Sequence, residues 1–154
     1  MIDIQGTEDF SHPSEKFLRG IDVYTLLPQQ EPFVMVGSLV AFDTQTTVTE
    51  TVIDSSNLFV EDGVFTEAGL VENIAQTCAV RLGYVNKYIL KEAIQIGYIG
   101  AVRNFEIAGL PPVGAAITTT VVVREEVFGV TLVDARIECE GEVLVTTEMK
   151  IAIK

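Results

Sequence analysis

The stretch EAGLVENIAQTCAVRLG, residues 67–83, decides the fold, because its apolar residues recur with the period of an α-helix. On a helical wheel these residues form one broad arc, which is the pattern of a helix pressed into a core. The arc contains Leu70, Val71, Ile74, Ala75, Cys78, Leu82 and Val85. We expect the helix to begin at Glu67, with Thr66 as its cap, and to continue to about Leu90.

Glu72 lies off this apolar arc, on a side of the helix where small residues recur. Those small residues are Ala75, Ala79 and Gly83. Another backbone could therefore pass close to the Glu72 carboxylate. Two interpretations stay open. Beside Asn73 and Gln76, Glu72 has the ordinary composition of a solvated helix face, or else it is a functional carboxylate on a helix that is covered on two sides.

The composition indicates one globular domain, residues 1–154, whose first 20 residues form a polar lead-in segment. Hydrophobic residues make up 48% and charged residues 21%, which is enough for a generous core. No apolar run approaches the length of a membrane span, and the N-terminus is unlike a signal peptide, so we expect a cytoplasmic protein. The net charge of -12 argues against nucleic acid and anionic membranes as partners.

The cysteines and the histidine argue against a disulfide framework and against a metal site. Cys78 and Cys139 are expected to be buried thiols. His12 is the only histidine in the chain, and it stands in a polar N-terminal stretch. We therefore expect no metal and no cofactor.

The remainder of the chain has the alternation and β-branched residues of strands. Residues 33–42 and 46–53 should form a hairpin, after a short helix within 21–28 and before a loop at 54–66. Four further strands are expected at 94–107, 116–124, 127–139 and 142–153, joined by turns at 109–114, 125–126 and 140–141. A long antiparallel sheet with one apolar helix is stable only if it curls around that helix, so the fold class is α+β, a curved antiparallel sheet around one central helix.

Four blocks in this order carry a family resemblance. They are LPQQEPFVMV (27–36), VENIAQ (71–76), IGAVRNF (99–105) and PPVG (111–114). Together they resemble motifs of the 3-hydroxyacyl-acyl carrier protein dehydratases of fatty acid synthesis and their relatives. The resemblance implies the hotdog fold and an acyl thioester substrate on acyl carrier protein or coenzyme A. Because VENIAQ is similar to the family's Leu-Glu-Ala-Met-Ala-Gln, it also implies that Glu72 is the catalytic carboxylate.

The chain departs from the family where the family has histidine. The family's catalytic histidine stands fourteen residues before the glutamate, and here Leu58 occupies that position. Gln29 replaces the histidine of the opening block, and Thr66-Glu67 replaces the Pro-Gly that opens the family helix. The shortened motif, with Asp62-Gly63 before the helix, more closely resembles that of divergent relatives in polyketide-like pathways, such as those making aryl polyenes.

The implied chemistry is removal of water from a 3-hydroxyacyl thioester, which needs a base, an acid and hydrogen-bond donors to the enolate oxygen. We expect Glu72 to supply acid or base. The residues assigned to substrate contacts are Gln29, Asn57, Leu58, Gly69 and Gln76. A single carboxylate could move the proton from carbon to oxygen if its surroundings raised its pKa, at a rate about 10²- to 10⁴-fold below that of a complete site.

Two alternatives remain besides this dehydratase. One is an acyl thioesterase that uses Glu72 with Gln76 and Thr77. The other is a catalytically inactive subunit that pairs with a histidine-bearing homologue, since the family's sites lie at a dimer interface. The expected assembly is accordingly a homodimer or a heterodimer with a related hotdog protein. An acidic carrier protein would need local cations, for which Arg81, Lys87 and Arg103 are the candidates.

Overall fold

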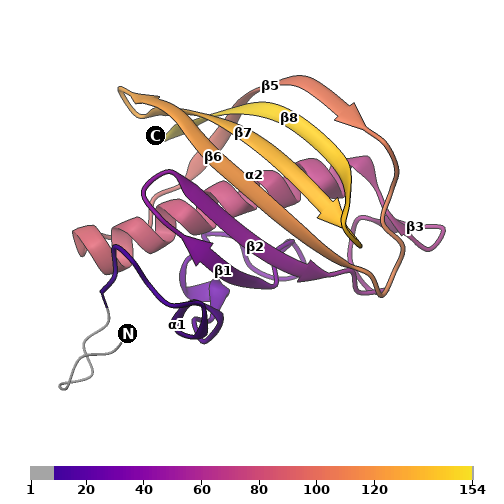
Figure 1. Ribbon diagram of the computed structural model, residues 1–154, viewed down its shortest axis with the longest axis horizontal. Helices are drawn as coiled ribbons and strands as arrows, with labels where there is room; N and C mark the ends of the chain where they lie inside the picture. The colour runs from indigo at the N-terminus through magenta and orange to yellow at the C-terminus, as the bar shows by residue number, and fades with distance from the viewer. Residues whose placement is uncertain (1–8, 154) are drawn as a thin grey trace.

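The computed structural model describes residues 9–153, in which a curved antiparallel sheet wraps around one long helix (Figure 1). The helix is α2, Glu67–Tyr84, extended by the π-helical segment η2, Val85–Leu90. The sheet has the strand order β1-β2-β6-β7-β8-β5, with every neighbouring pair antiparallel. The strands are β1 Ser38–Phe42, β2 Thr46–Val52, β5 Gly97–Ile107, β6 Ala116–Val127, β7 Val130–Cys139 and β8 Glu142–Ile153. The expected α+β architecture is confirmed.

The main core lies between the concave face of the sheet and one side of α2. Side chains alternate between the two faces of a strand, and β7 illustrates this. Val133, Ala135 and Ile137 are buried. Asp134 and Arg136, between them in sequence, are exposed. The helix residues that meet this core are Leu70, Ile74 and Cys78, all on the apolar arc that the sequence predicted.

The polar side of α2 is buried as well, so the interpretation as a solvated helix face is wrong. Asn73, Gln76 and Thr77 are 0% exposed. The Asn73 amide donates to the Met35 carbonyl over 2.7 Å and accepts from the Thr119 hydroxyl. Buried polar groups are stable only when they are hydrogen-bonded, and these groups are. The helix is therefore covered on two sides, by the sheet and by the segment that precedes β1.

That segment runs along α2 in the opposite direction. A side chain at Gly83 would collide with the Leu26 carbonyl, so the backbone passes the helix closely there, as the small residues predicted. Two turns earlier, Gln76 donates to the Phe33 carbonyl and accepts from the Met35 amide, each over 2.7 Å. The strand expected to begin at 33 instead begins at Ser38, because this stretch bonds to the helix rather than to another strand.

The described part of the lead-in segment packs against the rest of the fold. From residue 9 it belongs to the described part of the chain, while residues 1–8 lie outside it. It contains helix α1, Glu15–Arg19, which packs against β1 and buries Leu18. Rings of Phe10 and Phe17 pack on Tyr88 of η2, with centroids 5.3 and 5.6 Å away. The short helix expected within 21–28 is one 3-10 turn, η1, Val23–Thr25.

Several expected boundaries shift. The loop at 54–66 holds a small hairpin, β3 Val60–Glu61 and β4 Val64–Phe65. Thr66 is at the N-cap position, but its hydroxyl donates to the Phe59 carbonyl instead of capping α2. The turn expected at 125–126 lies at Phe128-Gly129, both with positive φ, the backbone that a two-residue hairpin requires.

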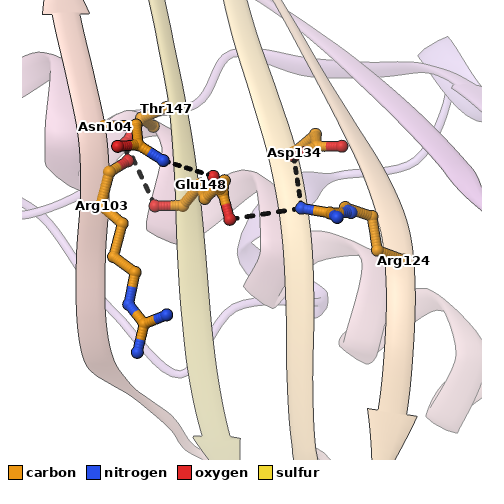
Figure 2. A network of polar contacts seen from close by, with 6 residues as sticks. All are labelled: Arg103, Asn104, Arg124, Asp134, Thr147 and Glu148. Atoms are coloured by element: carbon orange, nitrogen blue, oxygen red, sulfur yellow. Dashed lines mark hydrogen bonds and ion pairs between the residues drawn. The ribbon is translucent and has the colours of Figure 1, made fainter.

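A polar network covers part of the outer face of the sheet (Figure 2). Arg124 lies 3.5 Å from Asp134 and 3.2 Å from Glu148. The Asn104 amide donates to the other Glu148 oxygen over 2.6 Å. In Figure 2 the Arg103 guanidinium points away from these residues. These acidic side chains are therefore paired on the convex face, away from α2.

Across residues 9–153, no helix combines the length and the apolar composition that crossing a bilayer requires.

Candidate active site

A cavity of about 310 Å³ lies between α2 and the ends of strands β5 to β8. Its helix side includes Glu72 and the small residues Ala75 and Ala79. These two alanines therefore leave space for a ligand, whereas Gly83 leaves space for the backbone at Leu26. The remaining lining residues are Gln29, Cys78, Arg81, Leu82, Gly97, Tyr98, Ile99, Glu126, Thr131, Val133, Ile151 and Ile153. The walls combine apolar side chains with several polar ones, a mixture that can both hold and orient a small molecule.

The Glu72 carboxylate is held by its neighbour one turn along the helix. Gln76 Nε2 donates to Glu72 Oε1 over 3.0 Å and to the Phe33 carbonyl over 2.7 Å. Gln76 Oε1 accepts from the Met35 amide. The amide of Gln76 is thus oriented by the backbone, and it orients Glu72 in turn. Its contact with the substrate stays a prediction, and within this chain both amide atoms are already hydrogen-bonded.

Gln29 shares the cavity with Glu72, so two residues predicted from distant motifs come together. Gln29 lies on the segment between the helix contacts of Leu26 and Phe33, and lines the cavity with Ala79. Within residues 9–153, its Oε1 atom is buried without a hydrogen-bond partner. A buried oxygen of this kind favours a ligand that donates a hydrogen bond to it.

The other three predicted contact residues lie outside the cavity. Asn57 accepts from the Phe59 amide over 2.9 Å and donates to the Met35 sulfur over 3.2 Å. Leu58, at the position of the family histidine, is 52% exposed. Gly69 is buried where a Cβ would strike the Phe65 ring, so its small size serves packing. Their roles in substrate binding remain predictions, because within a single chain these residues do not line the cavity with Glu72.

Arg81, Glu126 and Thr131 form a polar group in the cavity that sequence reasoning missed. Arg81 is only 12% exposed, with Nη1 3.6 Å from Glu126 Oε2 and Nη2 3.3 Å from the Thr44 carbonyl. Thr131 donates to the same Glu126 oxygen over 3.1 Å. The sequence analysis placed Arg81 in a surface patch with Lys87 and Arg103, but its side chain lines the cavity. The position of a residue near a helix end does not reveal what covers that end.

Cys78 also lines the cavity, but its thiol stays un-ionised and therefore unreactive. Burial raises the pKa of Cys78 to about 12, since a thiolate there would lose its hydration. Burial also raises the pKa of Cys139, which is half-buried rather than fully buried as the sequence predicted. Burial therefore disfavours the reactive thiolate at both cysteines, and most strongly at Cys78. Within residues 9–153, no group of His, Cys, Asp and Glu is placed to hold a metal ion.

We expect iodoacetamide at pH 8 to modify Cys139 well before Cys78. The thiolate is the reactive form, and Cys78 is both buried and further from ionisation. Mass spectrometry of digests taken over time would measure the two rates, and Cys139→Ala should leave a protein that is almost unmodified until it is unfolded in urea. Rapid modification of Cys78 in the folded chain would contradict this assignment.

Comparisons with known proteins agree with this architecture. The model of the ApeP-like family, described as ApeP dehydratase, matches residues 21–153. No curated protein matches the chain in sequence. Among solved structures, a chain of the dehydratase heterocomplex ApeI:P from Xenorhabdus doucetiae is similar with a TM-score of 0.82 and 20% identity, covering 88% of this chain and 93% of that chain.

More distant structures have the same fold. A hypothetical thioesterase with coenzyme A from Streptococcus pneumoniae has a TM-score of 0.60 and 9% identity, covering 75% of this chain and 84% of that chain. The E. coli PaaI protein from the phenylacetic acid degradation operon has a TM-score of 0.56 and 11% identity, covering 74% and 80%. The expected hotdog fold is confirmed. Because the family model matches most of the chain, the chain belongs to the ApeP-like dehydratases, a divergent group of hotdog dehydratase-like proteins.

Proposed function

We propose that the chain is a subunit of a 3-hydroxyacyl-thioester dehydratase and works with a related hotdog protein. The observation that carries the proposal is the Glu72 carboxylate, held by Gln76 at the wall of the cavity. The substrate would be an acyl thioester of acyl carrier protein or coenzyme A in fatty acid or polyketide-like synthesis, handled in the cytoplasm. The ApeP-like family membership supports this substrate class.

The proposed reaction removes one water between C2 and C3 of the acyl chain. A base takes the C2 proton, and its electron pair becomes the C2=C3 double bond. The C3–O bond breaks with that oxygen receiving a proton from an acid, so that water leaves. Glu72 in its protonated form is the acid in this scheme, and Gln76 keeps it aimed into the cavity. Gln29 is proposed to bind the substrate through its unpartnered oxygen.

The second acid-base group is proposed to come from the partner. Of the other titratable groups that line the cavity, Cys78 stays neutral, Arg81 is a guanidinium that serves as neither acid nor base, and the Tyr98 phenol is on the edge strand β5, 50% exposed. Glu126 is engaged by Arg81 and Thr131. His12, the only histidine, is exposed on the N-terminal segment, where it lies 3.4 Å from Asp9. A histidine-bearing hotdog partner would complete the site, and the likeness to a chain of a dehydratase heterocomplex supports such pairing.

The open edge of β5 is the proposed contact with this partner. β5 is an outer strand of the sheet with one described neighbour, β8. It is eleven residues long, and Tyr98, Ile99 and Val102 are 38–50% exposed along it. The opposite outer strand, β1, is short and packs against α1. Proteins rarely leave a long apolar edge unpaired, so β5 is suited to pairing with a second sheet. Tyr98 and Ile99 also line the cavity, which would place the partner beside the site.

Replacing Ile99 and Val102 together by Lys should weaken this pairing at least tenfold. Two charges on an edge strand oppose strand pairing and burial, while both positions are exposed in the single chain and so tolerate the change. Native mass spectrometry after co-expression with a histidine-bearing homologue would measure the complex. Val143→Lys, at another exposed apolar strand position, is the matched control. An unaffected complex would mean that the partner binds elsewhere.

The carrier protein is proposed to approach through Lys87 and Arg103, without Arg81. Lys87 is exposed on η2, and Arg103 is exposed on β5. The side chain of Arg81 is withdrawn into the cavity, so the patch of three cations does not form. Arg103→Glu should weaken binding of the acidic carrier if this approach is correct, because rim charges of opposite sign steer such partners.

The test of the function is mass spectrometry of 3-hydroxyacyl and trans-2-enoyl carrier proteins incubated with the chain alone and with its partner. Interconversion by the mass of one water supports the dehydratase. Release of free carrier would identify a thioesterase instead. The geometry does not favour the thioesterase, because the two side chains that it would use with Glu72 are engaged within the chain. Gln76 is hydrogen-bonded to the backbone, and Thr77 to Thr49 and to the Asn73 carbonyl. A chain that forms only inactive homodimers would overturn the proposal.

A further inference from the structure

We propose that the cavity selects acyl chains that carry a hydroxyl at their far end, bound between Arg81 and Glu126. This inference rests on the proposed function, because it takes the ligand to be an acyl thioester that reacts at Glu72. Charged side chains line the cavity at two levels of α2, Glu72 near the start of the helix and Arg81, beside Glu126, nine residues further along. Between them the helix side is lined by Ala75 and Ala79, against which an extended chain could lie.

Arg81 and Glu126 do not form a direct hydrogen bond with each other. The closest nitrogen and oxygen are 3.6 Å apart, well beyond the roughly 2.7–2.9 Å of a direct charge-assisted hydrogen bond. Within residues 9–153, Arg81 Nε is buried without a hydrogen-bond partner. A buried N–H that makes no hydrogen bond is costly, so a ligand oxygen that accepts from it would be favoured.

The charges identify the kind of oxygen. A phosphate or carboxylate would accept from Arg81 but would be repelled by the Glu126 carboxylate beside it. A hydroxyl accepts from Arg81 with its oxygen and donates its own proton to Glu126, so it satisfies both neighbours without adding charge. Thr131 holds Glu126 from the other side over 3.1 Å, which fixes the acceptor in place.

The spacing along α2 bounds the chain length. Glu72 and Arg81 are nine residues apart on the helix, which is about 13.5 Å along its axis. A fully extended chain advances roughly 1.2 Å per bond, so about ten to twelve bonds separate C3, where Glu72 acts, from the hydroxyl. The hydroxyl of a shorter chain would not reach Arg81. A chain of the same length that ends in a methyl group would place that methyl beside Arg81, where it makes no hydrogen bond.

Calorimetric binding of pantetheine thioesters to the full chain, with its partner where one co-purifies, tests this inference. The probes are 13-hydroxytridecanoyl and tetradecanoyl thioesters, matched in heavy atoms, and the shorter pair 6-hydroxyhexanoyl and heptanoyl. We expect the long hydroxylated probe to bind about tenfold more tightly than its methyl-ended match, and the short pair to bind equally. Arg81→Met and Glu126→Leu should each reduce the tenfold ratio to near one.

Glu126 is 53% exposed, so Glu126→Leu keeps the test decisive if Arg81→Met fails to fold. Equal binding of the two long probes by the wild-type chain would overturn the inference, as would a ratio that both variants leave unchanged. If 3-hydroxyacyl substrates are dehydrated while the long probes bind equally, only the hydroxyl site is refuted. If no acyl thioester binds or reacts, the proposed function fails together with it.

Discussion

Glu72→Gln should lower the rate of dehydration by the chain and its partner about 10²- to 10⁴-fold, the usual loss when one acid-base group is removed. The amide has the size and shape of the carboxylic acid and can still accept from Gln76 Nε2, which lies 3.0 Å from Glu72 Oε1. It cannot give a proton to the departing hydroxyl. The effect should therefore fall on kcat, with substrate binding nearly unchanged. Mass spectrometry of 3-hydroxyacyl carrier protein over time measures it.

Glu67→Gln is the matched control for this experiment. It makes the same chemical change on the same helix, at an exposed residue that does not line the cavity. We expect full activity from it, and the same thermal stability from both variants. Turnover that survives in Glu72→Gln would show that the carboxylate is not the acid, and the search would move to groups of the partner.

Asn73→Leu should lower the free energy of unfolding by about 3–5 kcal/mol, since it removes a buried hydrogen-bonding group from partners that stay buried. Asn73 donates to the Met35 carbonyl over 2.7 Å and to Thr51 over 3.3 Å, and it accepts from Thr119. Leucine matches its size approximately but leaves these groups unpaired. Equilibrium unfolding in urea, followed by circular dichroism, measures the change.

Gln45→Leu provides the comparison for the Asn73 variant. It also exchanges an amide for leucine, but at an exposed position before β2, where we expect a change within about 0.5 kcal/mol. A loss below about 1 kcal/mol in Asn73→Leu would mean that the network contributes little beyond the area that the side chain buries. Because the same network holds residues 33–35 on α2, the Asn73 variant should also disturb the orientation of Gln76 and Glu72.

Much of the fold could be predicted from the sequence, because its signals are local. The period of residues 67–83 and the alternation in β7 describe how each element presents its own side chains, and both survive in the structure. The boundaries that shifted are those where a distant segment competes for the backbone. Residues 33–37 have strand composition, but the Met35 amide bonds to Gln76, forty-one residues away.

The candidate site was predictable in part. Glu72 and Gln29 were found through their motifs, and they line the same cavity. Arg81 was assigned to the surface, and Gln76 to the substrate. Charge and polarity are properties of the residue, whereas its role depends on what faces it. Arg81 lies 3.6 Å from Glu126 in the cavity wall, and Gln76 faces the backbone at 33–35.

The sequence by itself determined the central helix, the antiparallel strands around it and the position of the one carboxylate that the family motif marks. Only the tertiary structure decided that the polar side of α2 is buried, that small residues leave room for a cavity at Ala75 and Ala79, and that Arg81 lines this cavity. The physical reason is that sequence patterns are local, whereas tertiary contacts join residues far apart in the chain. Periodicity fixes the direction of a side chain relative to its own helix, but Asn73 finds its partners 38 and 46 residues away, and no local pattern specifies those meetings.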